Sequence, residues 1–99
     1  MPHIVVWSPH SLECMRNLYD FLAEKDMDAA KKAAKLILKH VDILEKFPNA
    51  GRPADDLEPE HRELLIPFGR TGYVLLYHFP DGGDEVTVLA IKHQMAVGY

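Results

Sequence analysis

Residues 72–93, GYVLLYHFPDGGDEVTVLAIKH, decide the fold class because they contain two strands in succession. The first run, GYVLLYHF, is almost entirely apolar, which is typical of a central strand covered on both faces. The second run, EVTVLAIKH, alternates with the period of a strand and places Val86, Val88 and Ala90 on one face. The DGGD between them indicates a two-residue hairpin turn. This half of the chain therefore predicts an antiparallel sheet.

Upstream of these strands, the sequence predicts one strand and then two helices. The run 3–7, HIVVW, is β-branched and aromatic, Ser8 is placed as a helix N-cap, and Pro9 suits the first helical position. Asp26 or Asp28 is expected to cap the second helix, which has the more regular apolar stripe. The stripe residues expected to be buried are Leu12, Met15, Leu18, Tyr19 and Leu22 in the first helix, and Ala30, Ala33, Ala34, Ile37, Val41, Leu44 and Phe47 in the second.

A proline-rich and acidic segment, PNAGRPADDLEPEH, separates the helices from the sheet and predicts a loop. The run RELLIPF after it carries Pro67, which favours an edge strand or a bent one. The element order is therefore β-α-α-β-β-β. It predicts an α+β fold in which a helical hairpin packs on a small, mainly antiparallel sheet, and residues 1–99 are expected to form a single domain.

Composition limits the classes of function. The net charge is −4, whereas proteins that grip a nucleic-acid backbone usually have a basic surface, so direct nucleic-acid chemistry is disfavoured. Cys14 is the single cysteine, which excludes a disulfide within the chain and fits a reducing, cytoplasmic setting. Neither a signal-peptide pattern nor an apolar run near the length of a membrane span is visible, so no membrane association is expected.

The six histidines show no HxH or HxxxH pairing, so neither a metal site nor a cofactor is expected. Arg52, Arg62 and Arg70 follow the helices, where a sheet face could gather them to hold a carboxylate or phosphate. The alternative is that each arginine closes a loop or forms a cross-strand ion pair.

Three segments together resemble the RelE/ParE superfamily of toxins from bacterial type II toxin–antitoxin modules. They are VVWSPHSLECMRNLYDFL, FPNAGRP, and the ordered strand set RELLIPF, GYVLLYHF and EVTVLAIKH. The resemblance runs from Val5 to about His93, and the family's helical hairpin on a twisted antiparallel sheet agrees with the element order inferred above. It implies a toxin that is neutralised by a cognate antitoxin.

The superfamily has two branches: ribosome-dependent endoribonucleases that cut mRNA, and ParE-like toxins that poison DNA gyrase without being enzymes. Ribonuclease members commonly carry an arginine directly after the tyrosine of the middle strand, where it stabilises negative charge on the scissile phosphate. Here the matching segment is YVLLY, and Val74 stands in the place of that arginine. The tail HQMAVGY contains no Arg or Lys after Lys92. Both departures favour the ParE-like branch.

The leading hypothesis is therefore a non-enzymatic toxin that inhibits DNA gyrase by protein–protein contact. Its expected partners are the antitoxin, with which it would form a hetero-oligomer, and gyrase, while DNA is reached only through these proteins. The expected contact residues are Arg52, Arg62, Arg70, Lys92, His93 and Gln94. Two alternatives stay open. One is an mRNA endoribonuclease that uses Arg70, His93 and Tyr99, and the other is a degenerate antitoxin-binding partner without toxicity.

Overall fold

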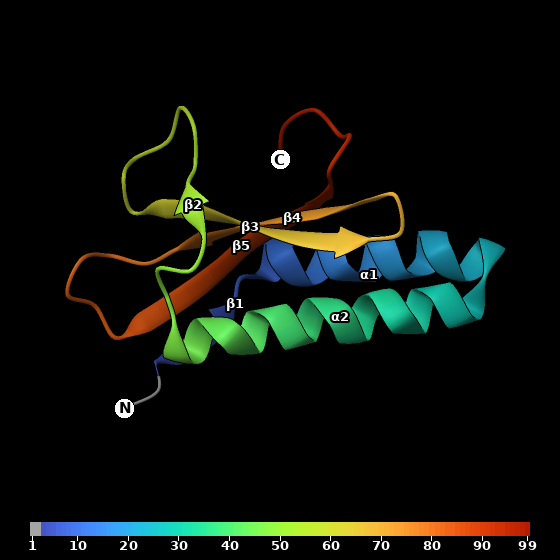
Figure 1. Cartoon of the computed structure of the whole chain (residues 1–99), viewed down its shortest axis with the longest axis horizontal. Helices are drawn as coiled ribbons and strands as arrows, with labels where there is room; N and C mark the ends of the chain where they lie inside the picture. Colours follow the sequence, from blue (N-terminus) through green and yellow to red (C-terminus); the bar gives the residue numbers. More distant parts are fainter. Residues whose placement is uncertain (1–2) are drawn as a thin grey trace.

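A computed structural model describes residues 3–99 and contains two helices and five strands. In chain order the elements are β1 (Ile4–Trp7), α1 (Pro9–Lys25), α2 (Met27–Lys46), β2 (Arg52–Pro53), β3 (His61–Phe68), β4 (Thr71–His78) and β5 (Glu85–His93). Both helices lie on one face of the sheet, and the β2–β3 loop and the C-terminal segment rise from the other face (Figure 1). The expected α+β class and helical hairpin are confirmed.

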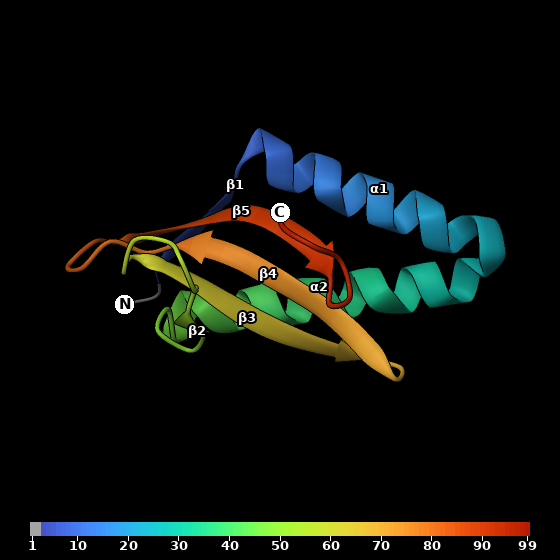
Figure 2. The same cartoon turned by 90° about the horizontal axis from the view of Figure 1, so that it is seen from above.

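The five strands form one sheet in the order β1-β5-β4-β3-β2. The pairs β4–β5, β3–β4 and β2–β3 are antiparallel, and β1 runs parallel to β5 (Figure 2). β4 is the middle strand, as its apolar sequence predicts, and its residues from Gly72 to Tyr77 are buried. The short β2, within the segment expected to be a loop, pairs only with Arg62 and Glu63. Much of β3, the strand that contains Pro67, therefore remains an edge.

The helical hairpin is capped as expected. The Ser8 hydroxyl accepts a hydrogen bond of 3.1 Å from the Ser11 backbone N–H at the start of α1. Asp26 alone separates the helices, and its carboxylate accepts hydrogen bonds from the backbone N–H groups of Asp28 and Ala29. A single connecting residue that caps the following helix holds the two helices as a tight antiparallel pair.

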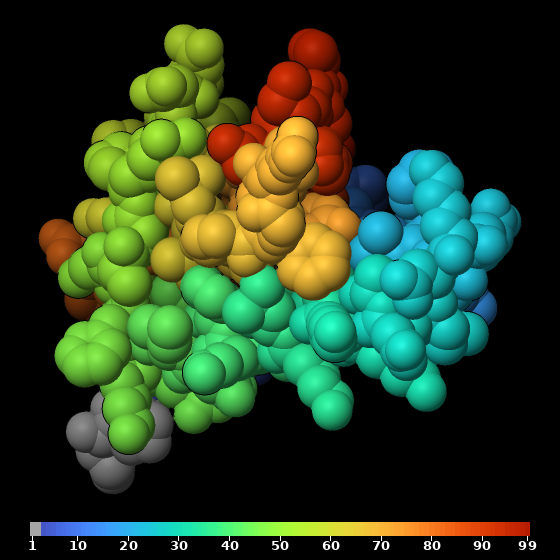
Figure 3. All heavy atoms as spheres, turned by 45° about the vertical axis from the view of Figure 1, so that its right-hand side comes forward, coloured from blue at the N-terminus to red at the C-terminus, as the bar shows by residue number. Residues whose placement is uncertain are grey.

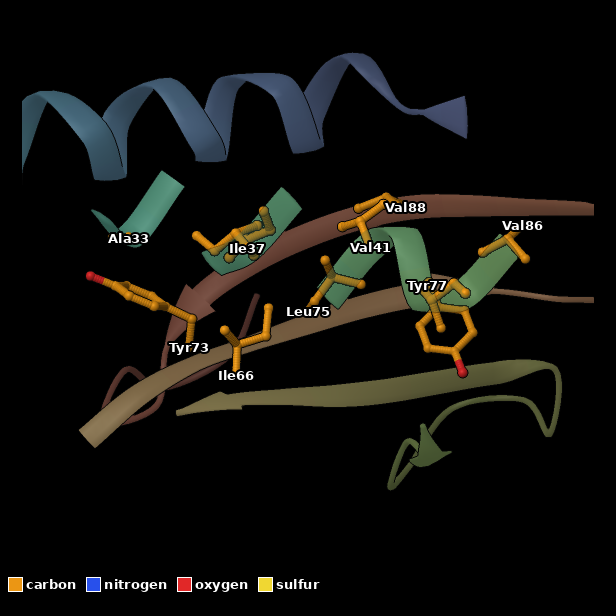
Figure 4. Close-up of a cluster of buried hydrophobic side chains, with 11 residues drawn as sticks. Ala33, Ile37, Val41, Ile66, Tyr73, Leu75, Tyr77, Val86 and Val88 are labelled. Atoms are coloured by element: carbon orange, nitrogen blue, oxygen red, sulfur yellow. The ribbon is translucent and has the colours of Figure 1, made fainter. Parts of the chain in front are cut away.

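The core lies between α2 and the sheet (Figure 4). Small Ala33 lets the helix approach closely, and Ile37, which is fully buried, fills the centre. Side chains of successive core residues in β4 alternate, so Tyr73, Leu75 and Tyr77 face the helices. A second, smaller cluster on the opposite face contains Ala54, Leu76 and Ala90.

Of the two hairpins, only the one between β4 and β5 differs from the expectation. β3 and β4 are joined by a two-residue turn, Gly69–Arg70, and Gly69 has a φ of 63° that suits glycine. The DGGD segment instead belongs to a longer connection, residues 79–84, that contains a turn closed from the Gly83 N–H to the Pro80 carbonyl oxygen. The prediction of a two-residue turn at DGGD was therefore wrong.

Two stripe residues expected in the core are exposed. Phe47 is 63% exposed because it is the C-cap of α2, with φ of −127° and ψ of 70°, so the helical period no longer determines its direction. Leu12 is 56% exposed in the first half of α1, on the side that faces solvent. No helix in the described part of the chain combines the length and apolarity needed to cross a membrane.

Candidate functional site

The sheet face opposite the helices, called the outer face below, carries a row of three paired residues. Val74 in β4 lies opposite Lys92 in β5 on one side and Leu65 in β3 on the other. Paired residues point to the same side of a sheet, so their side chains form one line across it. The β2–β3 loop and the tail, residues 94–99, stand up as two ridges on this side (Figure 3).

Glu63 is the centre of a polar cluster on the outer face. Its side chain is only 14% exposed, and its Oε1 accepts a hydrogen bond of 3.3 Å from the Arg52 Nε. Its Oε2 accepts a hydrogen bond of 2.6 Å from the Tyr99 hydroxyl. The Lys92 Nζ lies 4.5 Å from the centre of the Tyr99 ring, a cation–π geometry. One carboxylate thus connects a cation in β2 with the tail.

This environment keeps the Tyr99 hydroxyl protonated. Burial raises the pKa of Tyr99 well above its usual range, and the hydrogen bond to Glu63 and the charge of that carboxylate raise it further. A hydroxyl that gives its proton to a neighbouring carboxylate as a hydrogen bond is a poor general base near neutral pH.

His93 lies at the end of β5 and points to the other side of the sheet. It pairs with Tyr73, a core residue on the helix side, and the two rings are 5.8 Å apart. The His93 Nδ1 accepts a hydrogen bond from the Met95 backbone N–H, so Nε2 carries the proton in the neutral ring and donates to the Thr71 hydroxyl at 3.0 Å. His93 and Tyr99, two residues of the nuclease alternative, are therefore not brought together.

The remaining expected contact residues are dispersed. Arg62 is half-buried on the helix side, where its Nη1 donates a hydrogen bond of 2.7 Å to the Gly51 carbonyl oxygen and so closes the loop before β2. Arg70 is exposed in the β3–β4 turn, next to Thr71. Gln94 follows β5, and its backbone N–H donates to the Gly72 carbonyl oxygen. The structure groups Arg52 with Lys92 on the outer face and Arg70 with His93 at the end of the sheet.

An apolar groove of about 780 Å³ lies between α1 and the same end of the sheet. α1 contributes Leu18, Phe21 and Leu22, while Tyr73 and His93 belong to the opposite wall. Phe21 is 58% exposed at this groove, and the Lys25 Nζ lies 4.3 Å from the centre of its ring. The further lining residues are Cys14, Asn17, Phe68, Gly69, Thr71, Ile91 and Lys92.

No three histidine, cysteine, aspartate or glutamate side chains among the described residues are arranged to hold a metal ion. His78 instead bonds the Glu60 carboxylate at 2.8 Å, directly before the start of β3, which is a structural role.

Sequence reasoning missed Glu63 and the groove. Glu63 is a polar residue in an alternating strand, and its partner Tyr99 is separated from it by 36 positions, so no local spacing indicates the pair. Phe21 gave a signal that could have been used, because a phenylalanine outside the expected buried stripe of a helix indicates an exposed apolar contact.

Residues 5–97 match the model of a protein family described as the ParE toxin of the type II toxin–antitoxin system, parDE. The chain belongs to the ParE toxin family. It is a member of the wider RelE/ParE toxin superfamily, as the resemblance in the sequence implied.

Curated relatives of this ParE-family chain carry the RelE name. Toxin RelE1 of Caulobacter vibrioides is 32% identical over 93 residues, which cover 94% of this chain and 95% of that protein. Toxin RelE3 of the same organism is 31% identical over 88 residues, covering 88% and 89% of the two chains. The relatives therefore agree on a toxin of the superfamily, while their names and the family description differ in branch.

Two solved structures share the fold. A chain from the chromosomal ParDE system of P. aeruginosa superposes with a TM-score of 0.75 at 22% identity and covers 92% of this chain and 95% of that one. A chain from the toxin–antitoxin complex RelBE2 of Mycobacterium tuberculosis gives a TM-score of 0.65 at 18% identity and covers 94% and 99%. At these identities the similarity establishes the α+β architecture.

Proposed function

We propose that this ParE-family toxin acts in the cytoplasm by binding DNA gyrase and inhibiting it, without cutting RNA, and that a cognate antitoxin neutralises it. The observation that carries the proposal is the position of Glu63 on the outer face, between Arg52 and Tyr99. Both oxygens of this carboxylate are engaged, by Arg52 and by Tyr99, so Glu63 is not free to act as a general base, and its negative charge repels a phosphate placed on this face.

The neighbouring strand supports the same proposal. Val74, in the place of the ribonuclease arginine, is 4% exposed and can neither donate a hydrogen bond nor stabilise an anion. Lys92 lies opposite it in the ladder, but its Nζ is held over the Tyr99 ring and 3.4 Å from the Ala96 carbonyl oxygen. Arg52 and Lys92, the two cations grouped on this face, are thus both engaged in contacts within the chain.

We further propose that the apolar groove between α1 and the sheet receives a segment of the antitoxin. Phe21 and Tyr73 provide the aromatic surface on which an apolar side chain packs. His93, at one end of the groove, suits an acidic residue beside that side chain. The open edge of β3 beyond Glu63 offers a second place where an extended segment can pair.

The proposal is tested by expressing the toxin without its antitoxin and examining plasmid topology and transcripts in the same cells. Gyrase inhibition predicts relaxed plasmids together with intact mRNA. Intact supercoiling with mRNA cut at ribosomes would contradict the proposal. Normal growth with intact supercoiling and intact mRNA would identify the degenerate, non-toxic partner instead.

The ribonuclease alternative has one observation in its favour. Arg70 is exposed beside Thr71, which bonds His93, so a cation and a histidine lie at the same end of the sheet. This candidate requires a site made without Tyr99. It predicts ribosome-dependent cleavage that is lost in both Arg70→Ala and His93→Ala and kept in Tyr99→Phe.

A further inference from the structure

The tail, residues 94–99, folds back over the outer face of the sheet. Tyr99 contacts Glu63 in β3 and Lys92 in β5, two strands that are separated by β4. Neighbouring strands are about 4.8 Å apart, so a side chain that reaches both must lie across the middle strand. Tyr99 therefore lies over β4 between Leu76, the partner of Glu63, and Val74, the partner of Lys92.

The tail is attached by polar contacts and buries little apolar surface. Besides the two contacts of Tyr99, the Gln94 N–H donates to the Gly72 carbonyl oxygen, and the Ala96 N–H donates to the His93 carbonyl oxygen, both at 2.9 Å. Its apolar side chains contribute little burial, because Met95 is 73% exposed and the side chain of Val97 is wholly exposed. A segment held by a few exposed hydrogen bonds opens at low cost in free energy, unlike a strand of the core.

We propose that the tail is a latch that closes the outer face, and that the Tyr99–Glu63 hydrogen bond fastens it. In the closed form the Lys92 ammonium is occupied by the Tyr99 ring and the Ala96 carbonyl oxygen. Opening the latch frees this ammonium and uncovers Val74, next to Leu65, which is already 44% exposed in the closed form. The open face suits a protein segment that presents an acidic side chain to Lys92 and an apolar side chain beside it.

The proposal rests on the proposed function in taking gyrase as the protein whose acidic segment binds the open face. Only open molecules then bind gyrase, so the apparent Kd equals the Kd of the open form divided by the fraction of molecules that are open. Removing the fastening hydrogen bond raises that fraction. Loss of one hydrogen bond to a partly exposed carboxylate corresponds to a change of about three- to tenfold.

The experiment compares the wild-type toxin with Tyr99→Phe, Tyr99→Ala and the control Val97→Ala. The phenylalanine variant removes only the hydroxyl, the alanine variant also removes the ring over Lys92, and Val97→Ala changes a wholly exposed side chain of the same tail. Hydrogen exchange at the amides of residues 94–96 reports opening without any partner. Inhibition of gyrase supercoiling by the same preparations reports access to the face.

We expect exchange at residues 94–96 to be about three- to tenfold faster in Tyr99→Phe, still faster in Tyr99→Ala, and unchanged in Val97→Ala. The concentration for half-inhibition of gyrase should fall in the same order. Equal exchange in all four proteins would overturn the latch. Faster exchange with unchanged inhibition would overturn the role of the tail as a cover, because opening would then not affect gyrase binding. Faster exchange with weaker inhibition would also overturn it, because the closed tail would then itself contact gyrase. If even the wild type leaves gyrase active, the proposed function fails, and exchange alone decides whether the latch exists.

Discussion

The Tyr77 hydroxyl, at the centre of the sheet, donates a hydrogen bond of 2.7 Å to the Pro48 carbonyl oxygen just beyond α2. The same hydroxyl accepts a hydrogen bond of 2.9 Å from the Gly51 N–H. Tyr77 is fully buried, and its hydroxyl points away from the other labelled core side chains (Figure 4). One side chain therefore fixes the route of the chain from the helical layer to the edge of the sheet.

Replacing Tyr77 with phenylalanine should reduce the free energy of unfolding by about 1–3 kcal/mol, because a buried N–H and a buried carbonyl oxygen each lose a partner. Urea unfolding measures the change. Tyr73→Phe is the matched control, since the Tyr73 hydroxyl bonds no other described residue, and it should change stability by less than about 0.5 kcal/mol. Equal effects of the two substitutions would show that the Tyr77 hydroxyl does not fasten this segment.

Gly51→Ala should destabilise the protein by about 1–3 kcal/mol or more through overpacking. An added Cβ would lie 2.6 Å from the Glu63 carbonyl oxygen and 2.8 Å from the Tyr77 hydroxyl, and the first of these atoms belongs to the backbone. At Gly82, an added Cβ meets open space. The only cost of Gly82→Ala is then the backbone strain of an alanine at a φ of 75°, about 1 kcal/mol. Thermal unfolding of both variants checks the order, and a Gly82→Ala variant less stable than Gly51→Ala would contradict this packing.

Ile37→Ala should cost about 2–5 kcal/mol, because Ile37 is fully buried at the centre of the core and its loss leaves a cavity. Its neighbour Leu38 is 50% exposed, so Leu38→Ala should cost less than about 1 kcal/mol. Urea midpoints of the two variants, taken with the m-values, measure the difference. Similar losses would mean that α2 is rotated relative to the sheet from the orientation described.

Stability should fall as the pH rises above about 10. Burial raises the pKa values of Tyr73, Tyr77 and Tyr99 in the folded chain above the value of 10.0 that an exposed tyrosine has. The folded state therefore holds protons that the unfolded state releases, so this stability is fully present below pH 10 and is lost as the pH rises through the folded pKa values. Unfolding between about pH 8 and 11 should show a shallower fall for Tyr77→Phe than for the wild type. A fall of equal steepness in that variant would exclude Tyr77 as a source.

The helical hairpin and the β4–β5 pair could be predicted from sequence because each depends on local periodicity. The regular apolar stripe around Ile37 shows which face of α2 is buried, and the apolar run of β4 shows that this strand is buried on both faces. The β2 strand could not be predicted, because two residues carry no period and exist as a strand only through pairing with Arg62 and Glu63. The same holds for the irregularity in the β4–β5 register next to Tyr77.

The candidate site was predicted less completely for a related reason. Arg52 and Lys92 were identified by residue type, but their grouping on one face depends on strand register and on Tyr99 reaching back to Glu63. Arg62 was expected to contact a target, and the structure gives it a loop-closing hydrogen bond to Gly51. The residue type shows what chemistry a side chain can perform. The residues that it contacts depend on how distant parts of the chain come together.

A supercoiling assay with purified protein is the decisive test of the proposal that this toxin inhibits gyrase by contact and does not cut RNA. Relaxed plasmid, gyrase and ATP are incubated with increasing amounts of toxin, with and without an excess of the antitoxin. If the toxin inhibits gyrase by contact, supercoiling is lost in proportion to the toxin and restored by the antitoxin. Full supercoiling at a large molar excess of toxin, in a preparation that cuts mRNA on translating ribosomes, would contradict it.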